Sequence, residues 1–397
     1  MIRVLKRVAR RFVPVKILGM IRILRRIFHK FIPKEIIFWN TPRRSTTEII
    51  ESDPSWIAPS ARKRNLRNAG LPQDPVTALR RSPIVIYASS RNNYEMLEGE
   101  VLRNIDFEGI PFINIDDNSD DEQIALGKDI CQRNDIVFLK NKERGLQWAL
   151  RTVSDYLEEI GSPATWVIHI THDNFPIVDN FYSRIRDLVG SGKLDDFGCL
   201  GFNHIDFRNT PDSVTAWKSG NKVCGIVGRA VLSKVTTKVV PYKPSTILLP
   251  WEKWGRPFVV ETIVDVMAGI NIFLYRKLKI QASEKFTLHC WLDDICMQFL
   301  KHGHFNLVIP ELVAFNCQML KNKYNIPVKS FHAAREGDEY FYQGYGEHLV
   351  YWKEKWGWDR GDRPTFEKVR RRYEGSLIEA FYDFDPSQGP YKSIEDL

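Results

Sequence analysis

A polar turn in the middle of the chain contains residue types that bind divalent metal ions. Residues 166–170 are mostly apolar and have the length of a strand, and His172 and Asp173 follow almost directly. Open α/β sheets bind their ligands just beyond the carboxyl ends of such strands. A carboxylate there can hold Mg²⁺ or Mn²⁺ against a diphosphate. Asp173 is therefore a candidate metal ligand, and the alternative is that it only caps the turn before the next helix.

Polar side chains also follow two earlier apolar stretches. Ser89 comes just after residues 84–87, and Asp116 and Asp117 come directly after residues 111–115. The chain has no GxGxxG after the first of these stretches and no GxxxxGK[ST] motif. A nucleotide at these strand ends would therefore be held by carboxylates and a metal ion, not by a glycine-rich phosphate loop.

Two further groups of residues could act on an acceptor. Asp293 and Asp294 lie at the start of a predicted helix that runs to about residue 301, and the alternative is that they only stabilise its N-terminus. Trp251 and Trp254 lie in an aromatic and charged loop, where their faces could stack on sugar rings or pack in the core. We assign Trp251, Trp254 and the nearby Glu261 to an acceptor site.

The elements that position these residues alternate along the chain. The sequence predicts strands at 84–87, 111–115, 135–139, 166–170 and 197–202, and one leading to Pro310. Predicted helices separate them, including one over 146–160 that ends at Gly161. This alternation predicts a doubly wound, mostly parallel sheet flanked by helices.

This order of elements resembles the family 2 glycosyltransferases of the GT-A fold over residues 83–357. The resemblance implies a GT-A-like α/β domain in which an aspartate at the second strand end contacts the nucleoside. The metal motif Asp-x-Asp of the family falls on Thr171, His172 and Asp173, so its first acid is missing. The residues that we predict for nucleotide binding are Tyr87, Ser89, Asp116, Asp117, Asn141 and Gly145, and those predicted for the metal are Asp173 and His172.

The resemblance also implies a reaction. Family members transfer a sugar from a nucleoside diphosphate sugar to an acceptor hydroxyl with inversion, using a carboxylate as base and Mg²⁺ or Mn²⁺ as cofactor. The helix at residue 291 resembles the one that carries this base. We favour Asp294 as the base and give Asp293 a supporting role, although the register leaves both open. Residues 353–357 resemble a Lys-Trp-Gly segment that often follows the catalytic domain.

Two other functions are compatible with the same residues. A membrane-docked scaffold that binds a nucleotide sugar without turning it over would explain the missing acid of the metal motif. A nucleotidyltransferase would share a similar sheet, although such enzymes usually carry a glycine-rich signature near the first strand, and residues 84–92 have none.

Charge is concentrated at the N-terminus. Residues 1–34 contain eleven Lys and Arg and no Asp or Glu; because the whole chain is +8, the remainder carries −3. Apolar and basic residues alternate there at helical spacing, which predicts an amphipathic arm on an anionic membrane surface. The body of the protein is therefore not expected to bind nucleic acid.

The composition is that of a globular protein, with 43% hydrophobic residues. The six cysteines are dispersed, so we expect reduced core thiols, and we expect no membrane-spanning helix. The sequence predicts a cytoplasmic protein on the inner face of the membrane that acts in surface polysaccharide or glycoconjugate synthesis on a saccharide or lipid-linked acceptor. The predicted divisions are a membrane arm (1–34), a linker (35–82), a glycosyltransferase domain (83–330, with halves 83–180 and 181–330) and a C-terminal helical extension (331–397).

Overall fold

The structure is a computed structural model, and most of residues 74–378 are described. The described ranges are 74–92, 94–102, 106–171, 174–176, 180–206, 225–226, 248–249, 257–263, 267–287, 290–316, 338–359 and 366–378. The predicted membrane arm, residues 1–34, lies outside them. Within the described part of the chain, no helix combines the length and apolar character needed to cross a bilayer.

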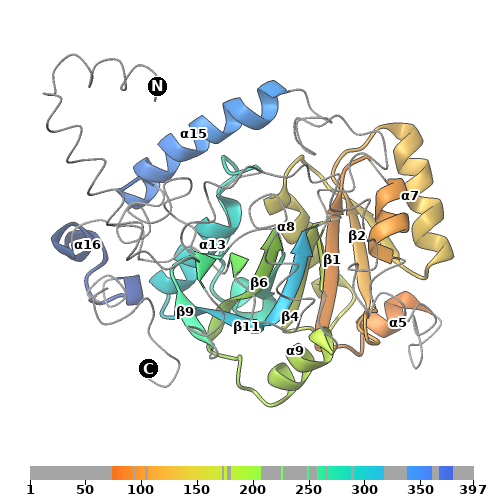
Figure 1. The fold of residues 1–397 in the computed structure, drawn as a ribbon, viewed down its shortest axis with the longest axis horizontal. Helices are drawn as coiled ribbons and strands as arrows, with labels where there is room; N and C mark the ends of the chain where they lie inside the picture. Colours follow the sequence, from red (N-terminus) through yellow and green to blue (C-terminus); the bar gives the residue numbers. More distant parts are fainter. Residues whose placement is uncertain are drawn as a thin grey trace, which may run out of the picture. The chain divides into compact units, whose positions relative to one another are not determined.

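Helices and strands alternate through the first half of the chain, as the sequence predicts (Figure 1). In chain order the elements up to residue 190 are α5 (Pro75–Leu79), β1 (Ile84–Ser90), α6 (Tyr94–Met96), the π-helix η4 (Leu97–Leu102), β2 (Phe112–Asp116), α7 (Asp121–Arg133), β3 (Val137–Lys140), α8 (Leu146–Glu159), β4 (Trp166–Thr171), β5 (Asn174–Pro176) and α9 (Phe181–Gly190).

The second half contains shorter strands and the C-terminal helices. Its elements are β6 (Phe197–Asp206), β7 (Gly225–Ile226), β8 (Leu248–Leu249), β9 (Phe258–Val260), β10 (Met267–Asn271), α12 (Ile272–Lys277), α13 (Trp291–Lys301), β11 (Phe305–Asn316), α15 (Asp338–Trp356) and α16 (Phe366–Tyr373). The predicted C-terminal helices are thus present.

The strands form one sheet in the order β3-β2-β1-β4-β10-β6-β11-β5, with β7, β8 and β9 attached to the second half. The α/β fold class is confirmed, and the first four strands are parallel. The second half is mixed, because β10 runs antiparallel between β4 and β6. β10 was not predicted, because its five residues carry no periodic signal of their own.

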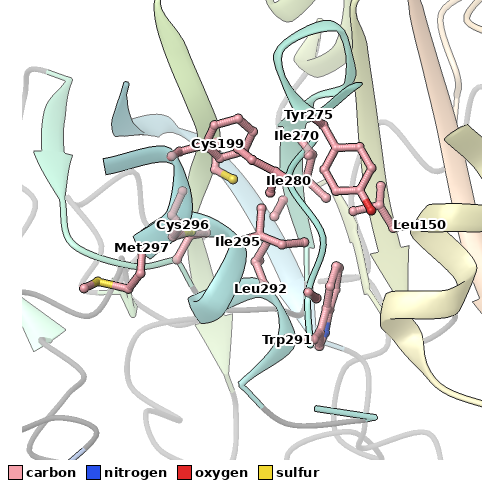
Figure 2. Packing of buried hydrophobic residues seen from close by; sticks show 14 of the residues in the cluster. Leu150, Cys199, Ile270, Tyr275, Ile280, Trp291, Leu292, Ile295, Cys296 and Met297 are labelled. Carbon is pink, nitrogen blue, oxygen red and sulfur yellow. The ribbon is translucent and has the colours of Figure 1, made fainter. Parts of the chain in front are cut away.

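The central strands are buried on both faces, as their apolar runs predict. In β1, Val85 and Tyr87 face one core cluster, whereas Ile84, Ile86 and Ala88 face the other. The first cluster includes residues of α8, α12, α13, α15 and α16, so the C-terminal helices share a core with the sheet. Figure 2 shows part of this cluster, with α13 residues near Cys199 of β6 and Tyr275 near Leu150.

Two segments add local detail to the predicted order of elements. The helix expected between the first two strands is a short α-helix followed by the π-helix η4. The predicted linker contains α5, which begins with a side-chain cap from Asp74 and a proline in its first turn, and which buries Leu79 in the core. Four of the six cysteines, Cys131, Cys199, Cys290 and Cys296, are buried in the core.

Candidate active site

The carboxyl ends of β1, β2 and β4 meet at one edge of the sheet. In the strand register Ser89 of β1 lies opposite both Ile115 of β2 and Thr171 of β4, and Ser90 lies opposite Asp116. Asp117 follows directly, and its backbone nitrogen donates to the Ser90 carbonyl oxygen at 2.8 Å. The structure therefore brings together three of the polar strand ends that the sequence identifies.

Asp117 presents one carboxylate oxygen that no described residue uses. Its Oδ1 accepts from Asn141 Nδ2 and from the Gly145 backbone nitrogen, both at 2.8 Å. No donor among the described residues reaches its Oδ2, and the side chain is almost buried, with 9% of the residue exposed. Burial raises the pKa of Asp117, and the hydrogen bonds from Gly145 and Asn141 oppose that rise. One oxygen is therefore fixed and the other can accept a hydrogen bond from a ligand.

Asn141 and Gly145 position Asp117. Asn141 also accepts a hydrogen bond at Oδ1 from Thr152 Oγ1 at 3.0 Å, so both ends of its amide are used within the chain. Gly145 has φ of 133°, a value that favours glycine, and precedes the first residue of α8. Both residues were predicted to bind nucleotide, and in the structure they contact the predicted nucleotide ligand Asp117.

The contacts of Asp116 are those of a carboxylate that stabilises the fold. It is fully buried, its Oδ2 accepts from Tyr94 Oη at 2.7 Å, and its Oδ1 accepts from the Ser119 backbone nitrogen at 3.1 Å. Tyr87 is likewise fully buried, three residues before the end of β1, and its ring lies 5.0 Å from that of His169. These positions do not favour direct nucleotide contact for either residue.

Asp294 is surrounded by donors. Lys355 Nζ lies 2.7 Å from its carboxylate, and Trp356 Nε1 donates to Oδ1 at 2.9 Å. The Ser283 backbone nitrogen and Gln298 Nε2 donate to Oδ2 at 3.1 and 3.0 Å. Burial raises the pKa of Asp294, and the Lys355 ammonium group opposes this rise. Two carboxylate oxygens accept about four hydrogen bonds, so this geometry does not favour Asp294 as a base.

Asp293 lies on the neighbouring face of α13, turned by about 100°. Burial raises the pKa of the Cys296 thiol, one turn along the helix, and Cys199 and the Asp293 carboxylate add to that rise. Asn306 links this helix to the segment that contains Glu261, because its Nδ2 donates to the Glu261 carbonyl at 3.0 Å and to the Cys296 carbonyl at 3.1 Å. Glu261 is half-buried.

Four predicted site residues lie outside the described part of the chain: the metal candidates His172 and Asp173, and the acceptor candidates Trp251 and Trp254. Within the described ranges, no group of three or more His, Cys, Asp or Glu side chains could hold a metal ion. The metal prediction thus depends on residues 172 and 173, which follow β4 directly.

The structure adds residues that the sequence analysis did not assign. Arg91 Nη1 donates to the Asp117 carbonyl at 3.0 Å, and Arg91 and Arg144 both lie near enough to the Asp117 carboxylate to favour its charged form. Their positions directly after a strand and before α8 were available signals. Lys355 and Trp356 were noted only as a motif, because their contact with Asp294 joins residues 61 and 62 positions apart.

No protein-family model and no curated protein sequence matches the chain. Similar solved structures include the mannosyltransferase PcManGT from Pyrobaculum calidifontis in complex with GDP-Man and Mn²⁺, at 12% identity and a TM-score of 0.43, over 85% of this chain and 80% of that one. GalNAc-T7 with UDP, GalNAc and Mn²⁺ is similar at 11% identity and a TM-score of 0.39, over 59% of this chain and 44% of that one. TarS 1–349 from S. aureus with UDP-GlcNAc is similar at 10% identity and a TM-score of 0.39, over 77% of this chain and 74% of that one.

Proposed function

We propose that the protein is a GT-A-type glycosyltransferase that moves a sugar from a nucleoside diphosphate sugar to an acceptor hydroxyl. The observation that carries this proposal is the Asp117 carboxylate at the carboxyl edge of the parallel strands. One of its oxygens is fixed by Asn141 and Gly145, and no described donor uses the other. Such a group is prepared to accept an N–H or O–H from a nucleoside.

The charge of the surroundings suits a nucleotide. Arg91 and Arg144 lie close enough to Asp117 for their charge to favour its ionised form, and guanidinium groups suit the phosphates of a nucleotide. Asp116 and Tyr87 support the strand ends from within the core, and Ser89 lies between Ile115 of β2 and Thr171 of β4 at the same edge.

We propose Asp293 as the general base. In the reaction the acceptor hydroxyl gives its proton to the carboxylate while its oxygen forms a bond to the anomeric carbon, and the bond from that carbon to the diphosphate oxygen breaks. Attack on the face opposite the leaving group inverts the anomeric centre. The N-terminus of α13 favours the negative charge that a base needs at neutral pH.

Asp173, with His172, would hold Mg²⁺ or Mn²⁺, whose charge offsets that of the diphosphate leaving group when the ion is bound. Both residues directly follow Thr171, the last residue of β4, and β4 is adjacent to β1 at the edge that holds Ser89. We further propose that Trp251, Trp254 and Glu261 contact a saccharide or lipid-linked acceptor.

The cellular setting is part of the same proposal. The basic and apolar pattern of residues 1–34 suits an anionic membrane surface, which would place the enzyme on the cytoplasmic side of the membrane in surface polysaccharide or glycoconjugate synthesis. The net charge of −3 outside this arm supports a body that does not bind nucleic acid.

A screen of nucleotide sugars for donor hydrolysis and transfer tests the proposal. One donor should be consumed in the presence of Mn²⁺, and Asp293→Asn should lower kcat by about 10²- to 10⁴-fold, the range for loss of a general base, while nucleotide affinity stays near wild type. Nucleotide binding with no turnover of any donor would favour the scaffold instead. Wild-type turnover in Asp293→Asn would refute the assignment of the base.

A further inference from the structure

The C-terminal helix α15 is joined to α13 through one buried carboxylate. Lys355 and Trp356, in the last turn of α15, both donate to Asp294 in the first turn of α13. The Asp294 side chain has no exposed surface, and that of Lys355 is 27% exposed. Removing one partner of a buried charge pair is strongly destabilising, because the other charge stays buried without compensation. This pair therefore fastens the end of α15 to the start of α13.

The same helix holds the loop that leads into α13. Ser283 Oγ donates to Tyr351 Oη at 3.1 Å, and the ring of Phe286 lies 5.0 Å from that of Tyr351. Lys285 Nζ lies 4.3 Å from the centre of the Tyr351 ring, within range of a cation–π contact. Ser283 also donates its backbone N–H to Asp294, so the loop and the carboxylate form one connected contact with α15.

This loop then reaches the nucleotide side. The Thr287 carbonyl oxygen accepts from the Leu146 backbone nitrogen, the first residue of α8, at 2.8 Å. The preceding residue, Gly145, donates to Asp117. The loop is therefore held at two points, on α15 and on α8, and the contact with α8 beside Asp117 does not involve Lys355 or Asp294.

We propose that Asp294 is a positioning residue, which fastens α15 to α13 and thereby holds Asp293 at the reacting centre. This inference rests on the proposed function, in which Asp293 is the base. The two aspartates are adjacent on one turn, so any shift of the helix that releases Asp294 also displaces Asp293. A displacement of about 1 Å at a catalytic group can lower a rate about 100-fold.

The test compares Asp294→Asn, Lys355→Met, the double variant and the conservative Lys355→Arg in the full chain. Lys353→Met is the matched control, because Lys353 lies on the same helix and pairs with Asp359 at 3.0 Å where both side chains are 57% exposed. The measurements are kcat with the donor found in the screen, nucleotide affinity by calorimetry, the pH dependence of kcat, and the thermal midpoint.

We expect Lys355→Met and Asp294→Asn each to lower kcat by about 10- to 100-fold and to change nucleotide affinity by less than about twofold. The double variant should lose no more than the single ones, since residues that act as one unit are not additive. Lys355→Arg should recover most of the turnover, and Lys353→Met should equal wild type. The acid limb of the kcat profile should persist in Asp294→Asn, because that variant leaves the proposed base, Asp293, in place.

Two results would overturn the inference. Wild-type kcat in Lys355→Met would show that the link to α15 does not position the base. Loss of the acid limb in Asp294→Asn, with Lys355→Met unchanged, would make Asp294 itself the base. Failure of the proposed function gives a different result. Asp293→Asn would then be fully active, while the Asp294 and Lys355 variants would still lower the thermal midpoint non-additively. In that case Asp294 fastens α15 to α13, and only the link to Asp293 is wrong.

Discussion

Asp117→Asn should remove most of the nucleotide affinity and leave the fold intact. The wild-type Oδ1 accepts from two nitrogens at 2.8 Å, those of Asn141 and Gly145. An asparagine must keep its oxygen on that side, because its NH₂ group cannot face two donors. The NH₂ group then takes the place of Oδ2 and meets the ligand donor that the carboxylate would accept.

The expected size follows from one lost charge-assisted hydrogen bond. Such bonds contribute about 1.5–3 kcal/mol, and about 1.4 kcal/mol corresponds to tenfold in affinity. Binding of UDP and GDP, titrated by calorimetry with Mn²⁺, should therefore weaken roughly 10- to 100-fold for the nucleotide that wild type prefers. Wild-type affinity in the variant would refute the assignment of Asp117 as the nucleotide ligand.

The thermal stability of Asp117→Asn, measured relative to wild type, should increase with pH. Burial raises the pKa of Asp117, so the stability that this group contributes is greatest at low pH and is lost as the pH rises through the raised pKa. Asparagine does not titrate, so the thermal midpoint of Asp117→Asn relative to wild type should increase from about pH 3 to about pH 6. A relative midpoint that falls over this interval would contradict the direction of the shift.

Asp116→Asn is the matched control. It makes the same substitution one residue earlier, where both oxygens accept hydrogen bonds from the chain itself, from Tyr94 and Ser119. It should lower the free energy of unfolding by about 1–3 kcal/mol, the cost of a mispaired buried group. The folded fraction should bind nucleotide as wild type does.

Three further predictions concern the metal, the loop and the arm. Asp173→Asn should weaken Mn²⁺-dependent nucleotide binding in calorimetry more than His172→Ala does, and equal binding in wild type and Asp173→Asn would refute the ligand assignment. Gly145→Ala should cost about 1–3 kcal/mol of stability in denaturant titrations and weaken nucleotide binding, because its Cβ would lie 2.7 Å from the Thr287 carbonyl oxygen at a φ of 133°; an unchanged denaturation midpoint would contradict this. Deleting residues 1–34 should release the protein from vesicles of anionic lipid in sedimentation assays, and wild-type binding should fall with salt; continued sedimentation of the truncated protein would refute the membrane role.

Most of the first half of the fold could be predicted from sequence because local patterns determine it. The apolar run of β4 and the helical spacing of α8 each carry a signal within one element, and both were predicted to within a residue or two. The position of β10 could not be predicted this way, since its antiparallel place between β4 and β6 depends on pairing with distant segments. The cap at Asp74 was a usable local signal for α5, and the nearby prolines obscured it.

The residue types of the candidate site could be predicted from sequence, but the role of each residue could not. Strand ends and a helix start identified five candidate aspartates, of which Asp116, Asp117, Asp293 and Asp294 lie in the described part of the chain. Which of them can meet a ligand depends on donors that arrive from elsewhere in the chain, such as Tyr94 for Asp116 and Lys355 for Asp294. No spacing rule reports such contacts.

The number of internal donors on each carboxylate distinguishes the roles that sequence leaves open. Asp116 has one donor on each oxygen, and Asp294 has donors from four residues, so the chain itself uses both groups. Asp117 accepts from two described donors, both on a single oxygen. A carboxylate held in this way is rigid and still has acceptor capacity, which is what a binding site needs from a residue that orients a nucleoside. The same reasoning makes Asp294 poorly suited to take a proton, because proton transfer to it would require the loss of at least one of its existing hydrogen bonds in a buried setting.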